Sequence, residues 1–487
     1  MKKNWLFIIS IIIWLVIGIY GIFFNITYID EAKYLIKGWL MTTGQVGYYS
    51  TPEFFYQHMP GGLLWYGIGQ KSFGPSLLVA RIQSFLIGLL VIVFTYKLAG
   101  LINTKAKKNI LPILSLAPVA ILYYSEAVPQ SIAAFSLIFG FYWLFKNRYR
   151  LATLSFCSSF LIRENFLFTL ILYLLFLIVV FRKDIKELVI NFLIAFVVLG
   201  IFIIPGWPGI LNVLKNFPGV SMLLPINAAE KAVLGLNWMQ VNYNLNNYLL
   251  AIREFGVVYF SFLLVGLIAL IKGIKNKMIW AKDNRWRFLL LIALLNFFAH
   301  TWSAFQLSPR AIIPYFAYFS PLLAVIISKL LKEKIRFYYW LLFLAIISLP
   351  IASIFQLPNR KNALRQLSLS ADSLKPIVAN KQNIVWLAEP MSLYLAGRVS
   401  YYPLINHTNF YKPSADTTTV KKLGLWNLEM MNQWLDEADL LVIDPNRLSF
   451  AKIDLTQELA DKWLPIVQPP DIWPKNLMFY EINESNR

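Results

Sequence analysis

The sequence predicts an all-α polytopic membrane protein with a small C-terminal α/β domain. Of the 487 residues, 58% are hydrophobic and only 14% are charged, whereas a soluble domain averages about 45–50% apolar and about 25% charged residues. Many separate apolar runs are long enough to cross a bilayer, which takes about 17–25 residues for each crossing. The tail from residue 356 loses this pattern and alternates short strand-like and helix-like segments.

Eleven apolar runs are expected to cross the membrane. They are residues 5–24, 76–102, 110–125, 130–146, 151–162, 165–181, 188–206, 255–271, 288–304, 311–328 and 338–355. The first run is expected to be a retained helix rather than a cleaved signal peptide, because the first alanine is Ala32 and no A-x-A cleavage site is available. Lys and Arg cluster in alternate connections, as in 272–287, and the opposite connections are poor in them. This positive-inside pattern predicts a cytoplasmic N-terminus and an extracytoplasmic C-terminal domain.

The chain therefore divides into a membrane module, residues 1–355, with a first outer loop at 25–75, and a C-terminal domain, residues 356–487. Within the tail, "NIVWLAEPMSLYLAGR" predicts a strand followed by a helix, "ADLLVIDP" a strand and "NLMFYEIN" a closing strand. Such alternation favours a small α/β domain.

The net charge of +20 does not indicate nucleic-acid binding, because the basic residues lie in short segments between apolar runs. The single cysteine, Cys157, excludes an intramolecular disulfide and is expected to be a small buried hydrophobic residue. Without disulfides or a recognisable sorting signal, the chain is expected in a prokaryotic plasma (inner) membrane.

Two adjacent carboxylates, Asp30 and Glu31, follow the first apolar run directly. Residues 32–41 continue as a helix with its apolar side chains on one side, which predicts an interfacial helix lying on the bilayer. Acidic residues also suit the positive end of a helix dipole, so capping alone could explain one of the two carboxylates.

Further charged residues fall in the outer loops: His58, Glu126, Arg163, Glu164 and Arg310. A charge drawn toward hydrocarbon costs at least about 2.5–3.5 kcal/mol, so such groups face water or one another. Local ion pairs or snorkelling would also account for them. Arg310 starts a helix, where a cation opposes the dipole and is better explained by an anionic partner. Because all these charges lie on one side, the pattern fits chemistry at the outer surface on a lipid-tethered substrate.

In order and position, these motifs resemble the glycosyltransferase-C superfamily, in the branch of the protein O-mannosyltransferases and lipid A aminoarabinose transferases (glycosyltransferase family 39-like). The motifs are Asp30-Glu31 after the first helix, His58-Met59-Pro60-Gly61, "YGIGQKSFGPSLLVARI", Glu126, and the spacing from Arg310 to Tyr315. The resemblance covers about residues 1–330 and rests on the succession of these motifs. It implies a glycosyltransferase-C-type fold for the membrane module.

The resemblance implies an inverting transfer of one sugar, hexosyl or pentosyl, from a polyprenyl-phosphate donor to a lipid, glycan or protein acceptor outside the cytoplasm. Asp30 is then expected to be the general base that takes the acceptor proton, with Glu31 the second catalytic candidate. Glu126 and Glu164 are expected to orient the acceptor. Glu31 and Glu126 are also candidate ligands for a divalent cation, Mg or Mn, because hard cations prefer oxygen ligands.

The leaving group in such a transfer is a lipid phosphate, whose growing charge needs cationic groups or hydrogen-bond donors. His58, Arg163, Arg310 and Tyr315 are the expected phosphate-binding residues.

Three other functions stay open on the sequence alone. A transporter or flippase of lipid-linked substrates would place its ionisable groups near the midplane and show repeat symmetry, and neither is evident. A polymerase or ligase of lipid-linked glycans shares the many crossings and large outer loops, but typically relies on arginines and a histidine in a late loop. A catalytically inactive scaffold would not need the carboxylates.

Overall fold

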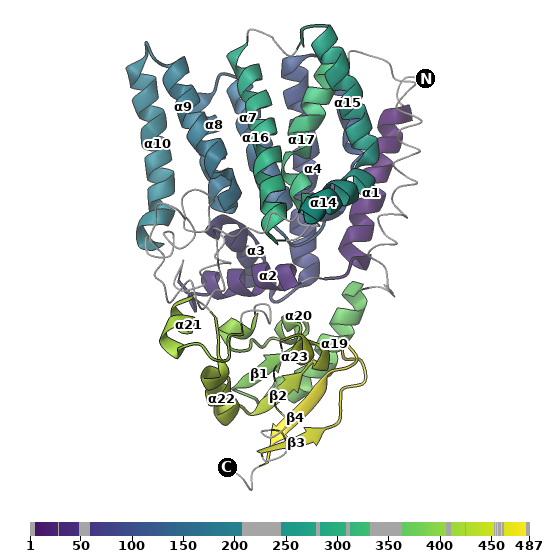
Figure 1. Ribbon diagram of the computed structural model, residues 1–487, viewed down its shortest axis with the longest axis vertical. Coiled ribbons are helices and arrows are strands. Elements are labelled where there is room, and N and C mark those ends of the chain that lie inside the picture. Colours follow the sequence, from purple (N-terminus) through teal and green to yellow (C-terminus); the bar gives the residue numbers. More distant parts are fainter. Residues whose placement is uncertain are drawn as a thin grey trace.

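The computed structural model describes residues 5–27, 29–47, 59–206, 245–278, 283–307, 312–331, 363–405, 411–423, 425–451, 453, 455, 459 and 462–483. Figure 1 shows a bundle of helices side by side, two shorter helices across one end of it, and a small mixed unit beyond those two. The N-terminus lies at the opposite end of the bundle. His58, Arg310 and the expected crossing at 338–355 lie outside the described residues.

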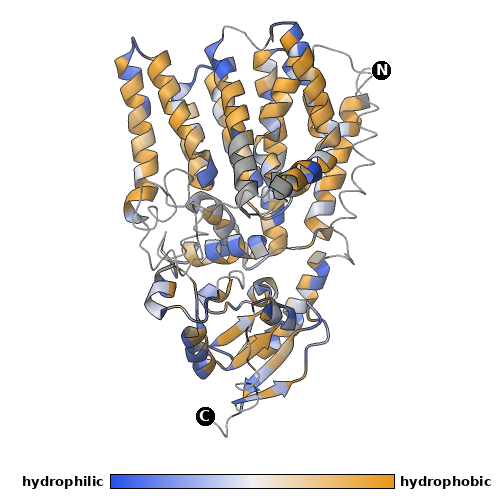
Figure 2. Cartoon of the chain, in the orientation of Figure 1, coloured by the Kyte–Doolittle hydropathy of each residue, from blue (hydrophilic) through white to orange (hydrophobic). Residues whose placement is uncertain are grey.

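The bundle is built from long apolar helices. They are α1 (Trp5–Phe24), α4 (Leu77–Ile102), α7 (Gln130–Phe145), α8 (Tyr149–Ile162), α9 (Leu167–Val180), α10 (Ile185–Ile203), α14 (Leu245–Val258), α15 (Phe260–Lys275), α16 (Asn284–Leu307) and α17 (Ile312–Leu331). The other described α-helices up to residue 331 are α2 (Ile29–Thr42), α3 (Pro60–Phe73), α5 (Ile110–Leu114) and α6 (Pro118–Tyr123). Figure 2 shows that the long helices are hydrophobic over most of their length, as spans in lipid must be.

Among the described residues, four helices are long and apolar enough to cross a membrane: α1, α4, α10 and α17. The bent pair Ile252–Val258 and Phe260–Lys275 would make a fifth, and α7, α8 and α9 are apolar but shorter. The expected count of eleven crossings therefore stays a prediction. The expected crossing over 110–125 is divided into two short helices, because the chain breaks between α5 and α6. Ala117, which precedes Pro118, has left the helical region (φ −118°, ψ 63°), as the proline ring requires of the residue before it.

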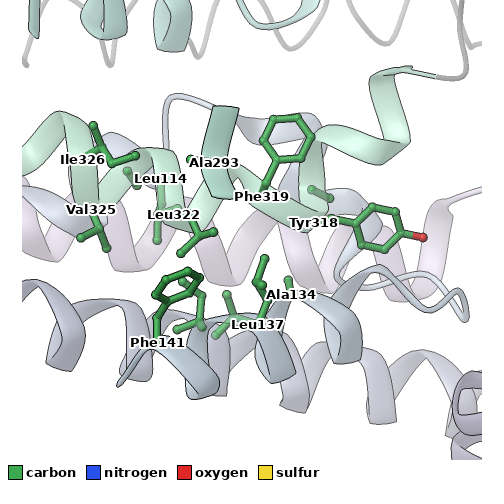
Figure 3. Packing of buried hydrophobic residues seen from close by; sticks show 14 of the residues in the cluster. Leu114, Ala134, Leu137, Phe141, Ala293, Tyr318, Phe319, Leu322, Val325 and Ile326 are labelled. Atoms are coloured by element: carbon green, nitrogen blue, oxygen red, sulfur yellow. The ribbon is translucent and has the colours of Figure 1, made fainter. Parts of the chain in front are cut away.

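Helix α17 lies at the centre of the bundle and packs on α4, α7, α15 and α16. In Figure 3, Leu322 of α17 faces Leu137 and Phe141 of α7, whereas Phe319 points to the opposite side of α17. The Phe319 ring lies edge-on against Phe297 of α16. The outer helix α10, by contrast, buries only Asn191 and Ala195 and exposes its apolar side chains. Helices with an apolar outer face and a close-packed inner face are typical of a bundle surrounded by lipid. Cys157 is fully buried, as expected.

Helices α2 and α3 cross at two glycines. A Cβ on Gly67 would overlap the carbonyl group of Gly38, and one on Gly38 would approach the Gly67 main chain. Thr42 uses this closeness, because its hydroxyl donates a 3.1 Å hydrogen bond to the Gly67 carbonyl. Only glycine at both positions allows the two backbones to come this near.

The described residues from 363 to 483, here called the C-terminal unit, form a four-stranded sheet with helices around it. The strand order is β1 (Ile384–Leu387), β2 (Leu440–Ile443), β4 (Met478–Ile482) and β3 (Trp463–Ile466). Strands β1 and β2 are parallel, and β4 runs antiparallel to both β2 and β3. The helices are α19 (Ala363–Val378), α20 (Pro390–Leu395), α21 (Thr417–Leu423), α22 (Leu428–Glu437) and α23 (Pro445–Ala451).

The three strands expected from the sequence are confirmed as β1, β2 and β4, and the helix after the first of them is α20. Strand β3 was not expected. It contains Pro465, which cannot donate to a ladder and is tolerated here because β3 lies at the edge of the sheet.

We predict that Gly67→Ala destabilises the protein although alanine is the better helix former. The new methyl group must push α2 and α3 apart, and overpacking of this kind costs about 1–3 kcal/mol. Gly256→Ala in α14 is the matched control, because a Cβ there meets nothing within 4 Å; it should be neutral or stabilising by up to about 1 kcal/mol. Thermal unfolding of the detergent-solubilised protein measures both, and equal midpoints for the two variants would contradict the close crossing.

Candidate active site

The predicted site residues that the structure describes gather at the end of the bundle beside the C-terminal unit. Asp30 and Glu31 start α2, and Glu126 lies in the turn between α6 and α7. Arg163 and Glu164 connect α8 to α9, and Tyr315 is in the first turn of α17. Their contacts divide these residues into three groups. Glu31 belongs to a buried ion pair, Arg163 belongs to an arginine–tyrosine cluster, and Asp30 is an exposed carboxylate.

Glu31 is completely buried in an ion pair with Arg81 of α4. The guanidinium donates to both carboxylate oxygens, at 2.9 Å from Nε to Oε1 and 2.7 Å from Nη2 to Oε2. The main-chain amide of Ala127 donates a third bond to Oε1, at 2.7 Å. Neither side chain of the pair is exposed to solvent. This carboxylate is thus committed to holding α2 against α4 and the 126–127 turn, and the geometry assigns it a structural role rather than the catalytic one expected.

The same arginine closes the end of α1. Its Nη1 donates to the main-chain oxygens of Ile22 and Asn25, both at 3.0 Å. The last carbonyls of a helix have no partner within the helix, so Arg81 satisfies groups that would otherwise be buried and unpaired.

Glu126 is also buried, and its carboxylate accepts a hydrogen bond from the Asn25 side chain. A divalent cation between Glu31 and Glu126 would need oxygen ligands facing it, but the oxygens of Glu31 already accept bonds from Arg81 and Ala127. A guanidinium at bonding distance would also repel the cation. Glu31 and Glu126 therefore do not fit the expected metal site. Among the described residues, no group of three or more His, Cys, Asp or Glu side chains could hold a metal ion.

Arg163 forms a second, separate cluster with tyrosines from α2 and α17. Its Nη1 donates a 2.7 Å hydrogen bond to the Tyr34 hydroxyl, and it also hydrogen-bonds the side chain of Tyr315. Its Nε lies 3.7 Å from the Glu164 carboxylate. Burial raises the pKa of the Tyr34 phenol well above its ordinary value, so this hydroxyl stays neutral. The cluster presents one cation and several hydroxyl groups, which suits an oxyanion.

The N-terminus of α3 lies against this cluster. A Cβ on Gly61 would meet the Leu161 carbonyl at 2.7 Å, and one on Gly62 would meet the Ile162 carbonyl at 3.3 Å. These carbonyls immediately precede Arg163, so the Pro-Gly-Gly sequence lets the start of α3 approach it. The amide groups at a helix N-terminus also favour negative charge.

Asp30 differs from the other carboxylates because its side chain is 62% exposed. The Lys33 ammonium, one turn further along α2, lies 3.9 Å from its carboxylate. The charge of Asp30 reaches Tyr34 and Tyr315 of the arginine–tyrosine cluster. Asp30 is therefore an accessible carboxylate whose charge acts on the arginine–tyrosine cluster.

The C-terminal unit covers the other side of α2. The Tyr394 hydroxyl donates a 3.2 Å hydrogen bond to the Gln70 side chain, and its ring packs edge-on against Trp39. The Lys37 ammonium lies 5.4 Å from the centre of the Tyr402 ring, close enough for a cation–π interaction. Helix α2 is therefore a layer between the bundle and the C-terminal unit, in which Lys33 and Lys37 are both buried. It lies across the end of the bundle (Figure 1), and its expected position on the bilayer surface stays a prediction.

Helix α20 packs on α2 in one buried cluster, and Glu389 directly precedes α20. Burial raises the pKa of its carboxyl from 4.5 to about 7, against the opposing effect of the Arg447 guanidinium, and the charge of Asp30 adds to the rise. The sequence predicts no role for Glu389 or Tyr34, and it includes Arg81 only as part of the motif "YGIGQKSFGPSLLVARI". Only Arg81 had a clear signal, a charge inside an apolar crossing, where a partner is expected.

Known structures show which fold carries this arrangement. The chain aligns with ArnT from Cupriavidus metallidurans bound to undecaprenyl phosphate over 99% of this chain and 98% of that one, with a TM-score of 0.58 and 12% identity. The apo structure of the same protein aligns with a TM-score of 0.44 and 11% identity, over 97% of both chains. No protein-family model and no curated protein matches the sequence. The first alignment confirms, for the fold, the resemblance to the lipid A aminoarabinose transferases.

We predict that Arg81→Met strongly destabilises the protein, because it leaves Glu31 buried without its cation and the end of α1 without its donor. Breaking a buried pair from one side costs about 3–5 kcal/mol. Arg150→Met is the matched control, since Arg150 pairs with Glu187 at the surface, where the arginine is 55% exposed and the pair contributes about 0–1 kcal/mol. Thermal unfolding in detergent compares the two, and similar losses would show that the buried pair does not anchor the end of the bundle.

Proposed function

We propose that the chain transfers one sugar from a polyprenyl-phosphate donor to an acceptor hydroxyl, with inversion, at the end of the bundle beside the C-terminal unit. One observation carries this proposal: an accessible carboxylate, Asp30, stands beside a buried arginine–tyrosine cluster. The Asp30 carboxylate is exposed and can take a proton. The arginine–tyrosine cluster offers a cation and hydroxyl donors that can bind an oxyanion. The fold is that of ArnT, which was crystallised with undecaprenyl phosphate, and this supports a lipid phosphate as the oxyanion.

In the proposed reaction, the acceptor oxygen attacks the anomeric carbon as its proton passes to Asp30. The bond between that carbon and the phosphate oxygen breaks on the opposite side, and the electron pair leaves with the polyprenyl phosphate. General-base help of this kind is typically worth about 10²–10⁴ in rate.

Arg163 binds the departing phosphate in this proposal, with the hydroxyls of Tyr34 and Tyr315 as further donors. Groups held in place before the reaction stabilise the growing charge without rearranging. Glu164 keeps Arg163 oriented from the other side. His58 is two residues before the start of α3 in the sequence and Arg310 two residues before the start of α17, so both remain proposed phosphate ligands on sequence grounds. A divalent cation has no assigned ligand set here, and no step of the proposed reaction depends on one.

We predict that Asp30→Asn lowers sugar transfer by about 10²–10⁴ without lowering thermal stability, because the side chain is exposed. The assay follows transfer from a panel of undecaprenyl-phosphate sugars by membranes that contain the protein. Asp372→Asn is the matched control: Asp372 is 65% exposed and pairs with a lysine one turn later, as Asp30 does. Full transfer by the Asp30 variant would place the base elsewhere, and no transfer by the wild type with any donor would favour a lipid transporter.

We predict that Arg163→Lys weakens binding of undecaprenyl phosphate about tenfold or more, the loss of one or more charged hydrogen bonds. A lysine cannot reproduce the planar, two-pronged contact of a guanidinium with phosphate. Native mass spectrometry of the purified protein measures this, with undecaprenol as the phosphate-free comparison and Arg285→Lys, at a partly exposed pair with Asp283, as the control variant. Equal loss of undecaprenol binding would mean that Arg163 supports the fold instead of the phosphate.

A further inference from the structure

The carboxyl group of Glu389 is not used by the fold. Its main-chain oxygen accepts a 2.9 Å bond from the Trp386 indole, and Arg447 donates to the carbonyl of neighbouring Ala388. The backbone is therefore fixed on both sides of the residue. The side chain does not cap α20, and its buried Oε1 has no hydrogen-bond partner among the described residues.

A buried acceptor without a donor costs free energy and calls for an explanation. Burial in the folded chain raises the pKa of the Glu389 carboxyl from 4.5, its value in the unfolded chain, to about 7. The folded state therefore loses stability as the pH rises through that interval. A group that weakens the fold in this way, and lies beside an accessible carboxylate, is typical of a functional site.

Packing and electrostatic interactions relate Glu389 to the rest of the site. The charged groups that most affect its pKa are Arg447 of the C-terminal unit and Asp30, Lys33 and Glu31 of α2. The charged groups that act on Tyr34 are Arg163, Glu164 and Asp30. Asp30 is the charge common to both. Glu389 directly precedes α20, whose Met391 and Tyr394 pack in one buried cluster with Ala32 and Leu35 of α2. The charge of Asp30, at the start of α2, acts on both Glu389 and Tyr34 of the arginine–tyrosine cluster.

We propose that Glu389 binds the acceptor and that the acceptor is a saccharide. One acceptor hydroxyl gives its proton to Asp30, while a second hydroxyl donates a hydrogen bond to Oε1 of Glu389. This inference rests on the proposed function, in which Asp30 is the base and the bundle side of the site binds the phosphate. Two carboxyl groups require two donors on the acceptor. A polyol supplies both, whereas a serine or threonine side chain supplies only one.

The kinetic test uses Glu389→Gln, which keeps the shape of the side chain and removes its charge, with the donor and acceptor that support transfer by the wild type. The KM for the acceptor should rise about tenfold, the effect of one charged hydrogen bond, while the KM for the donor stays unchanged. Glu481→Gln is the matched control. Glu481 is on β4 and forms a partly exposed ion pair with Lys381, so this variant should alter neither the acceptor KM nor the donor KM.

The pH dependence gives a readout that a purely structural role would not move. A carboxylate accepts a hydroxyl hydrogen bond better than a carboxylic acid does. The wild-type acceptor KM should therefore fall as the pH rises from about 6 to about 8, and Glu389→Gln should lose this dependence. An acceptor KM equal to that of the Glu481 control, or an increase in the donor KM alone, would overturn the proposal.

A binding test separates this inference from the transfer reaction. Saturation-transfer NMR with the full-length detergent-solubilised protein compares methyl β-glucoside with N-acetylserinamide. The glucoside signal should be present for the wild type and Glu481→Gln, and lost for Glu389→Gln, with no signal from the serinamide. If the glucoside binds and needs Glu389, but the protein transfers no sugar, the proposed function is refuted and the saccharide site stands. If the protein transfers sugar, but Glu389→Gln leaves the glucoside signal unchanged, the saccharide site is refuted and the proposed function stands.

Discussion

The buried ion pair between Arg81 and Glu31 fixes the end of the bundle on which the candidate site is built. Burying two charges is favourable only when their remaining hydrogen-bonding groups are satisfied. Here the guanidinium also binds the end of α1, and the carboxylate also binds the amide of Ala127. The pair therefore joins α1, α2, α4 and the turn before α7 at one point. Asp30 is next to Glu31 in the chain, and Tyr34 follows one turn later, so their positions depend on this junction.

This junction explains why two carboxylates stand together where the chain leaves α1. Successive residues of a helix point about 100° apart, so α2 directs Glu31 into the bundle while Asp30 points outward. One carboxylate is fully buried and the other is 62% exposed. The first determines the position of the helix and the second remains accessible for chemistry. Adjacent residues of the same type thus have different roles because the helix presents them to different surroundings.

The sequence predicts the helical class, most of the apolar helices and three of the four strands, because these follow from periodicity and composition. It also finds Asp30 and Arg163, since charges beside apolar runs are conspicuous. It does not predict which charges pair. Glu31 and Arg81 are separated by 50 residues, and Arg163 and Tyr34 by 129, so only the packing of α2, α4 and α8 shows these contacts. Glu389 reads in the sequence as an ordinary acidic residue before Pro390, and its burial becomes visible only when the C-terminal unit is placed on α2.

The position of α2 as a middle layer has a consequence for how a reaction could be arranged. Lys37 lies against the Tyr402 ring and Lys33 is buried beside Asp30. Lys33 offsets the negative charge that Asp30 brings to this layer. A lipid-linked donor would arrive through the apolar bundle, and a polar acceptor would arrive past the C-terminal unit. Helix α2 supplies Tyr34 to the arginine–tyrosine cluster and packs against α20, which Glu389 precedes. In the proposed reaction the two substrates would therefore meet at Asp30, at the start of this helix.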